Sequence, residues 1–191
     1  MSVAIACPSN TDAPAVPAGS GGYVTVDLAA IVENWRRIGR IVGPGCTVAA
    51  VVKADAYGLG MAPVAQALAR AGCRWFFVAP VEEGLALVEA LDPDLSGLRI
   101  GVLSGPSVEC LVAPSLVPVI NDLGQLEAWR VMAPGRPAIL NLDTGMARLG
   151  MPVSEAAHLA ADPALLDGVP VAAVMSHLAC PDQHDHPMNE R

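Results

Sequence analysis

The chain contains a single lysine, placed where it could do covalent chemistry with an aldehyde. Of its eleven basic residues ten are arginine, and Lys53 is the exception. A GC-rich coding sequence explains why lysine is scarce, but not why this one follows the apolar run Thr47–Val52. An amine at the end of a buried strand is partly desolvated, which favours its neutral, nucleophilic form. Arginine cannot take that role, because a guanidinium stays protonated.

The residues that follow Lys53 could hold an anionic ligand. The phenol of Tyr57 could donate a hydrogen bond to a phosphate, and Gly58 and Gly60 allow a sharp turn close to a ligand. The residue types alone favour a structural interpretation, with the lysine stem lying along a strand end and the tyrosine packed in a loop, since many strands end in lysine.

Two further polar groups follow apolar strands. Arg148 lies in the glycine-bearing segment after the strand predicted at Ala138–Leu142, and His177 follows the strand predicted at Val169–Met175. By residue type alone, Arg148 could be a solvated loop residue and His177 a hydrogen-bonded histidine in the core or at its rim. Both gain functional meaning only together with the segment around Lys53.

The tail from Cys180 to His186 brings thiol, imidazole and carboxylate groups close together in sequence. These are the ligand types that Zn²⁺ takes, but no matching pair of ligands occurs upstream. We therefore predict no metal site and expect a solvated acidic loop.

Apolar runs alternate with helical periodicity and Gly/Pro punctuation, which predicts parallel βα units. After a short strand signal at 23–26 and a helix from Leu28 capped by Asp27, six strands are expected, at 47–52, 75–79, 99–103, 117–120, 138–142 and 169–175. Helices are expected at 63–70, 81–91, 123–132 and 154–160. The first of the six strands reads as buried on both faces.

Two α/β architectures fit this alternation, an open doubly wound sheet and a (β/α)8 barrel. The first strand lacks the glycine fingerprint of a dinucleotide fold. A barrel has eight strands and typically about 250 residues. The 191 residues would then form an open six-strand piece with unpaired edges.

Composition limits the function. A formal net charge of -8 argues against nucleic-acid binding, and no apolar run approaches the roughly 18 residues of a membrane span. Residues 1–22 lack the pattern of a signal peptide and are predicted to be a disordered leader, which leaves 23–191 as the folded domain. Five scattered cysteines suggest a reducing cytoplasm.

Four segments carry a family resemblance. Residues 51–60, VVKADAYGLG, resemble the cofactor attachment segment of the pyridoxal-phosphate-dependent alanine racemases of bacteria. TVDLAAIVENWRRI before it resembles the opening strand and helix of that family, and NLDTGMARLG at 141–150 resembles its second signature. SHLA at 176–179, with Asp182 and Asn189, resembles the segment after the sixth barrel strand. The matches are collinear from Tyr23 to Arg191.

The resemblance implies a fold, a cofactor and roles for four residues. The fold would be a partial TIM-type (β/α)8 barrel with about six of eight strands, without the C-terminal β domain of the family. Lys53 would hold pyridoxal 5'-phosphate as an internal aldimine and act as one of two bases, and Tyr57 would contact the phosphate. Arg148 would approach the phenolic oxygen of the cofactor and orient substrate. His177 would sit beneath the ring, as the partner of an arginine that holds the ring nitrogen.

The family interconverts L-alanine and D-alanine, supplying D-alanine for peptidoglycan, and works as a homodimer with shared active sites. Some members carry a carbamylated lysine where this chain has Asn141, which is instead expected to hydrogen-bond Arg148. The opposing base is a tyrosine from the C-terminal domain of the partner subunit, and neither Tyr23 nor Tyr57 matches it. The 191-residue chain alone is therefore expected to have little activity.

Three other functions stay open at the level of sequence. The chain could be a single-domain protein that handles pyridoxal phosphate without racemisation, although its lysine segment argues against this. It could be another enzyme of the same barrel class, such as an amino-acid decarboxylase or a broad-specificity racemase. It could also be a non-catalytic remnant that binds a partner through an open sheet edge.

Overall fold

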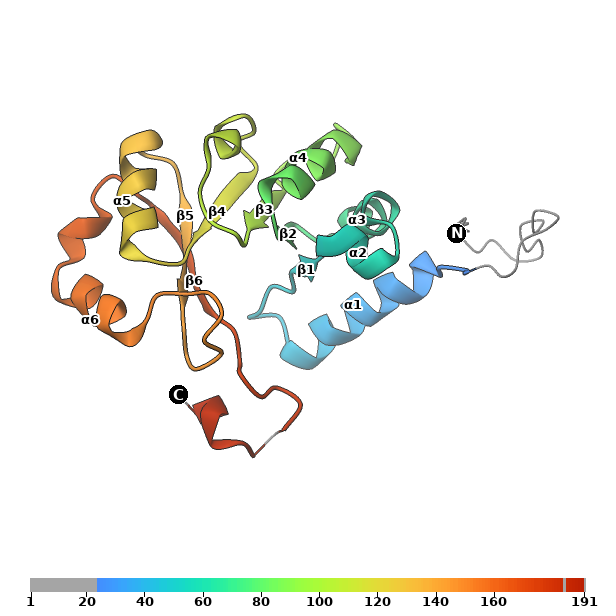
Figure 1. Ribbon diagram of the computed structural model, residues 1–191. Coiled ribbons are helices and arrows are strands. Elements are labelled where there is room, and N and C mark those ends of the chain that lie inside the picture. The colour runs from blue at the N-terminus through green and yellow to red at the C-terminus, as the bar shows by residue number, and fades with distance from the viewer. Residues whose placement is uncertain (1–23, 184, 191) are drawn as a thin grey trace. The chain divides into compact units, whose positions relative to one another are not determined.

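The computed structural model describes residues 24–183 and 185–190, which divide between two compact units, Met1–Ile100 and Gly101–Arg191 (Figure 1). The leader predicted at 1–22 lies outside the described residues. Among the helices of the described ranges, none has the length and hydrophobicity that crossing a membrane requires.

The order of the strands distinguishes the two expected architectures. The sheet has six strands in the order β1-β2-β3-β4-β5-β6. The β1–β2, β4–β5 and β5–β6 pairs are parallel. A doubly wound sheet reverses its strand order near the middle, whereas a (β/α)8 barrel adds each new strand on the same side. The sequential order confirms the α/β class and matches the barrel pattern.

The first unit packs its helices on short strands. Its elements are α1 (Leu28–Val42), β1 (Ala50–Val51), α2 (Lys53–Gly58), α3 (Met61–Arg70), β2 (Trp75–Val78), α4 (Val81–Ala90) and the first half of β3 (Arg99–Val102). The Asp27 carboxylate caps α1 by accepting the Ala30 N–H at 3.0 Å, as predicted. Phe76, Val78 and Leu87 are fully buried and form the centre of the core. The prediction of a strand at 23–26 is wrong for its described residues, 24–26, because Thr25 forms only an isolated bridge.

Strand β1 departs most from its prediction. It spans two residues rather than six, and Val51 is 46% exposed although burial on both faces was expected. The reason is its place in the sheet: β1 stands at the end of the strand order and has β2 as its strand neighbour. An apolar run shows that a strand can be buried, but its exposure depends on which elements cover it.

The second unit centres on two buried strands. Its elements are η1 (Val108–Leu111), β4 (Leu116–Ile120), α5 (Leu123–Met132), β5 (Ala138–Leu142), α6 (Val153–Ala161), η2 (Pro163–Leu166), β6 (Val171–Ser176) and η3 (Pro187–Glu190). All five residues of β4 are buried, whereas no residue of β6 is. β6 is the other end of the strand order, so it is exposed for the same reason as β1.

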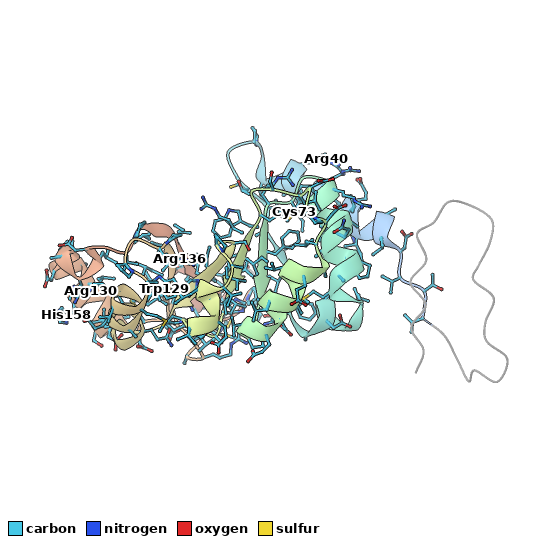
Figure 2. All side chains as sticks on the ribbon, turned by 90° about the horizontal axis from the view of Figure 1, so that it is seen from above. Arg40, Cys73, Trp129, Arg130, Arg136 and His158 are labelled. Carbon is cyan, nitrogen blue, oxygen red and sulfur yellow. The ribbon has the colours of Figure 1, made fainter. Side chains whose placement is uncertain are left out.

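Arg136 joins the η1 segment to the start of β5. Its guanidinium lies over the ring of the fully buried Trp129, 6.0 Å from the ring centroid, and Figure 2 labels both residues. It donates hydrogen bonds to four backbone carbonyls, those of Cys110, Leu111, Ala113 and Leu116. A planar cation with a fork of donors can reach several carbonyls at once, which an ammonium cannot do in the same geometry.

Candidate active site

Lys53 lies where the sequence predicted, directly beyond the last sheet contact of β1. The Val52 N–H donates to the Phe77 carbonyl at 2.9 Å, and Val52 is 1% exposed. Lys53 follows it and is half-buried. The amine therefore extends from the carboxyl end of a parallel strand, the end at which α/β barrels carry their catalytic groups.

The segment after Lys53 is one turn of left-handed helix. Residues 54–57 have φ between 51° and 56° and ψ between 35° and 50°, although none is glycine. A left-handed conformation costs L-residues about 1–2 kcal/mol each. The sequence predicted a sharp turn made by Gly58 and Gly60, and these glycines do have positive φ. It did not predict that the four residues before them share this handedness.

Hydrogen bonds around Asp55 hold this turn in place. The Ala56 N–H donates to the Val52 carbonyl at 2.9 Å, and the Gly60 N–H donates to the Asp55 carbonyl at 2.9 Å. The Asp55 carboxylate accepts the Met61 N–H at 2.6 Å, at the first residue of α3. Because short polar side chains tolerate the left-handed region and can bond locally, Asp55 suits its position.

Tyr57 is brought beside the lysine. The Lys53 Nζ lies 6.0 Å from the centroid of its ring, and Tyr57 is 64% exposed. A phenol displayed on the surface next to an amine is available to a ligand, which is the arrangement expected from sequence. The alternative of a tyrosine packed in a loop is wrong.

Glu83 is a residue of this region that the sequence analysis missed. Its carboxylate accepts the Ala54 N–H at 2.7 Å through Oε1 and the Ala79 N–H at 2.9 Å through Oε2. A glutamate at the third position of a helix is a recognised capping residue, so its bond near Ala79 could have been anticipated. The bond to Ala54, 29 residues away, depends on tertiary structure.

Arg148 lies in the second unit, on an exposed loop closed at its neck. The Asp143 N–H donates to the Met151 carbonyl at 2.9 Å, and the Met151 N–H donates to the Asn141 carbonyl at 2.7 Å. Gly150 has φ 114°, and a Cβ there would lie 2.8 Å from the Asp143 nitrogen. Only glycine fits this neck, so the glycine after Arg148 fixes where the loop returns to the sheet.

Asp143 organises the inside of the same loop. Its Oδ1 accepts the Gly145 N–H at 2.9 Å and the Ala147 N–H at 3.0 Å. The Ala147 N–H, and then that of Gly145, hold the pKa of the Asp143 carboxyl below its ordinary value of 3.8. The segment is therefore a built loop and more than the strand terminator that its residue types allowed.

The hydrogen bond expected between Asn141 and Arg148 is wrong. Asn141 is 6% exposed, and its Nδ2 donates to the Oδ1 of Asn121 at 2.9 Å. Asn121, also buried, donates in turn to the carbonyls of Leu103 and Val119, each at 3.1 Å. The Asn141 Oδ1 is buried without a partner among the described residues. Asn141 thus joins strand ends within the second unit, while Arg148 extends to solvent.

His177 follows β6 and is exposed. Asn189 holds the tail beyond it by donating to the carbonyls of Cys180 at 2.9 Å and Gln183 at 2.8 Å. Among the described residues, no three His, Cys, Asp or Glu side chains gather as metal ligands would. Lys53 and Tyr57 are thus together in the first unit, and Arg148 and His177 each follow a strand of the second.

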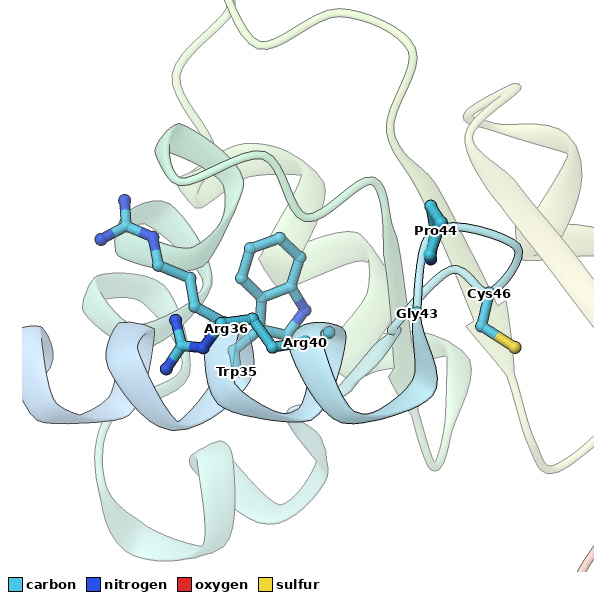
Figure 3. A pocket seen from close by; sticks show the side chains of 7 residues that line it. Trp35, Arg36, Arg40, Gly43, Pro44 and Cys46 are labelled. Carbon is cyan, nitrogen blue, oxygen red and sulfur yellow. The ribbon is translucent and has the colours of Figure 1, made fainter.

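An open hollow in the first unit is lined by residues that precede Lys53 in the sequence (Figure 3). Trp35, Arg36, Arg40 and Cys46 line it, at the end of α1 and in the loop that leads into β1. The Trp35 Nε1 donates to the Val48 carbonyl at 3.0 Å and fixes that loop. This loop enters β1 at its amino end, whereas Lys53 follows its carboxyl end, so the hollow is not part of the lysine site.

Similar proteins fall in one family. Residues 26–191 match the model of the alanine racemase N-terminal domain. The catabolic alanine racemase of Mesorhizobium japonicum is 47% identical over 93% of this chain and 48% of its own length. The alanine racemase of Rhodospirillum rubrum is 44% identical over 87% of this chain and 46% of its own. The chain thus spans about half the length of these curated relatives.

Solved structures similar to this chain belong to the same family. Alanine racemase from Bartonella henselae, with covalently bound pyridoxal phosphate, has a TM-score of 0.77 and 37% identity over 86% of this chain and 49% of that one. The enzyme from Streptomyces coelicolor has a TM-score of 0.71 and 33% identity over 85% and 45%. The expected barrel-type fold is confirmed, and this chain belongs to the alanine racemase family through its N-terminal domain.

Proposed function

We propose that the chain supplies the amino-terminal part of a pyridoxal-phosphate-dependent alanine racemase, with Lys53 as the residue that holds the cofactor. The observation that carries this is the position of the one lysine, half-buried at the carboxyl end of β1 and followed by a hydrogen-bonded left-handed turn. An amine beside an exposed phenol fits a phosphorylated aldehyde, because the amine can bond covalently and the phenol can donate to phosphate.

The other roles follow by position. Tyr57 would donate to the phosphate, Arg148 would orient the substrate carboxylate and the phenolic oxygen of the cofactor, and His177 would support an arginine at the ring nitrogen. The bound cofactor supplies the electron sink that makes the α-proton of alanine removable. Lys53 would accept and return that proton on one face of the α-carbon, within hydrogen-bond reach.

Racemisation needs a base on each face of the α-carbon. The chain has two tyrosines, Tyr23 and Tyr57, and the resemblance assigns the opposing base to neither. We therefore propose little turnover by the 191 residues alone, and a homodimer with shared sites for the longer enzyme that supplies D-alanine for peptidoglycan. The scattered cysteines support a cytoplasmic location. No observation favours a protein that only handles pyridoxal phosphate.

The test uses the fact that the chain has one lysine. The purified protein is incubated with pyridoxal phosphate, reduced with borohydride and weighed intact and after digestion. The cofactor should be fixed to the Lys53 peptide and absent from a Lys53→Arg variant. An adduct confined to the amino terminus, which is the competing amine, would overturn the proposal. Alanine turnover by the chain alone would overturn the requirement for a second base.

A further inference from the structure

The carboxylate of Glu83 joins the ends of two neighbouring strands. One oxygen accepts the N–H of Ala54, the residue after Lys53, and the other accepts the N–H of Ala79, the residue after β2. Glu83 is half-buried at the third position of α4. A single side chain thus links the residue directly after Lys53 to the adjacent strand end within the first unit.

Helix capping explains only half of this arrangement. A glutamate at the third helical position ordinarily returns to the N–H of the cap residue. The cap residue of α4 is Pro80, which has no N–H, so Oε2 takes the N–H of Ala79 instead. That bond stays local to the start of α4. The second oxygen reaches a different element and makes the shorter contact, 2.7 Å against 2.9 Å.

The second bond acts on the peptide that fixes the direction of Lys53. The carbonyl of Lys53 and the N–H of Ala54 belong to one planar unit, so holding the N–H also fixes the carbonyl. Ala54 has φ 51° and opens the left-handed turn. Without an external acceptor, this strained peptide would gain by relaxing to a right-handed or extended form.

We propose that Glu83 is a positioning residue for Lys53, which it holds in the one backbone orientation that presents the amine to the cofactor. This rests on the proposed function of Lys53. Glutamine at this position keeps the shape and one acceptor oxygen, but its NH₂ group faces one of the two N–H donors. Glu83→Gln should therefore break one bond of the bridge while leaving the packing of α4 intact.

Glu82 provides a matched control, since it carries the same charge one residue earlier and is exposed. Asp27→Ala provides a second control, because it removes the cap of α1 and lowers stability without touching the turn. The readouts are borohydride-trapped cofactor at Lys53, the visible absorbance of the unreduced imine adduct across pH, the thermal midpoint, and hydrogen exchange of the Ala54 amide.

With Glu83→Gln, trapping at Lys53 should fall about tenfold, as expected for loss of a hydrogen bond to a charged acceptor. The pH at which the absorbance of the unreduced adduct changes should shift, and the Ala54 amide should exchange faster. Glu82→Gln should match the parent, and Asp27→Ala should lower the thermal midpoint while keeping the adduct. Unchanged trapping in Glu83→Ala, which removes both acceptor oxygens whichever way a glutamine would turn, or an equal loss in Asp27→Ala, would reduce Glu83 to a structural cap and overturn the proposal.

Failure of the proposed function gives a different pattern. If the parent and Glu82→Gln chains form no adduct at Lys53, the cofactor assignment has failed. Amide exchange then decides the role of Glu83 by itself: faster exchange at Ala54 in Glu83→Gln alone supports control of the lysine segment, and unchanged exchange refutes it.

Discussion

Asp143 shows how one carboxylate can shape the loop that carries Arg148. Both of its bonds to backbone N–H groups end on a single oxygen, Oδ1. These donors favour the ionised form and lower the pKa of the carboxyl below 3.8. A group whose pKa is lowered by folding contributes stability above its unfolded pKa, and this contribution is lost as the pH falls through the folded pKa.

The loop around Arg148 should therefore loosen in acid. Protection of the Gly145 and Ala147 amides from hydrogen exchange should fall as the pH drops below 3.8. Asp143→Asn keeps the accepting oxygen but has no carboxyl to titrate, so its protection should not depend on this step. Comparing the two proteins at each pH cancels the intrinsic exchange rate. The same pH dependence in both would refute the role given to Asp143.

At this scale the sequence predicted the position of a residue well where that position depends on its place along a strand. Lys53 and Tyr57 lie beyond β1, and their neighbours in sequence supplied most of the evidence. The predicted partner of Asn141 was wrong, and the role of Glu83 was not predicted, for the same reason. Each makes a hydrogen bond across at least 20 residues of sequence, and the choice of partner depends on how strand ends meet in three dimensions.

The handedness of the turn after Lys53 leads to a prediction about a single element. Ala54 and Ala86 are both exposed, but Ala54 is left-handed and Ala86 lies in the right-handed α4. Ala54→Gly should raise the free energy of unfolding by about 0.5–1 kcal/mol, because glycine adopts positive φ freely. Ala86→Gly should lower it by about 1 kcal/mol. Chemical denaturation of both variants gives the sign of each change in unfolding free energy. Changes of the same sign would contradict the left-handed conformation of Ala54.

A second prediction at this scale concerns Arg136, which holds η1 against β5. Lysine cannot donate to four carbonyls and lie flat over Trp129, so Arg136→Lys should cost about 1–3 kcal/mol of unfolding free energy. Arg130 provides the comparison, since it pairs with Glu127 on the surface of α5. Arg130→Lys should change stability by no more than about 0.5 kcal/mol. Equal effects in denaturation curves would show that the four carbonyl bonds add nothing.

Two buried thiols report on the core of the whole molecule, one in each unit. Cys73 and Cys110 are fully buried, whereas Cys46 is exposed. Burial raises the pKa of the Cys73 thiol above 9.0, which further reduces its reactive thiolate. An alkylating reagent should modify Cys46 in the native chain and reach Cys73 and Cys110 only on unfolding. Mass spectrometry of the peptides gives the result, and labelling of one buried thiol in native buffer would show that its unit has opened.

At the scale of the whole molecule, periodicity predicted the alternation of strands and helices because each element's pattern is local. It could not predict the exposure of β1 and β6, because exposure depends on neighbours that the pattern of one strand does not specify. The strand order removed the doubly wound alternative, which the alternation alone had left open.

The single lysine also limits a lysine-specific protease to one cleavage site in the chain. A lysine-specific protease has one peptide bond to cut, between Lys53 and Ala54, and the N–H of that bond is the one held by Glu83. Cleavage requires the strained turn to open into an extended strand, so the cutting rate measures how often it does so. The rate at which the two fragments of fixed mass appear would thus measure the frequency of local unfolding at Lys53.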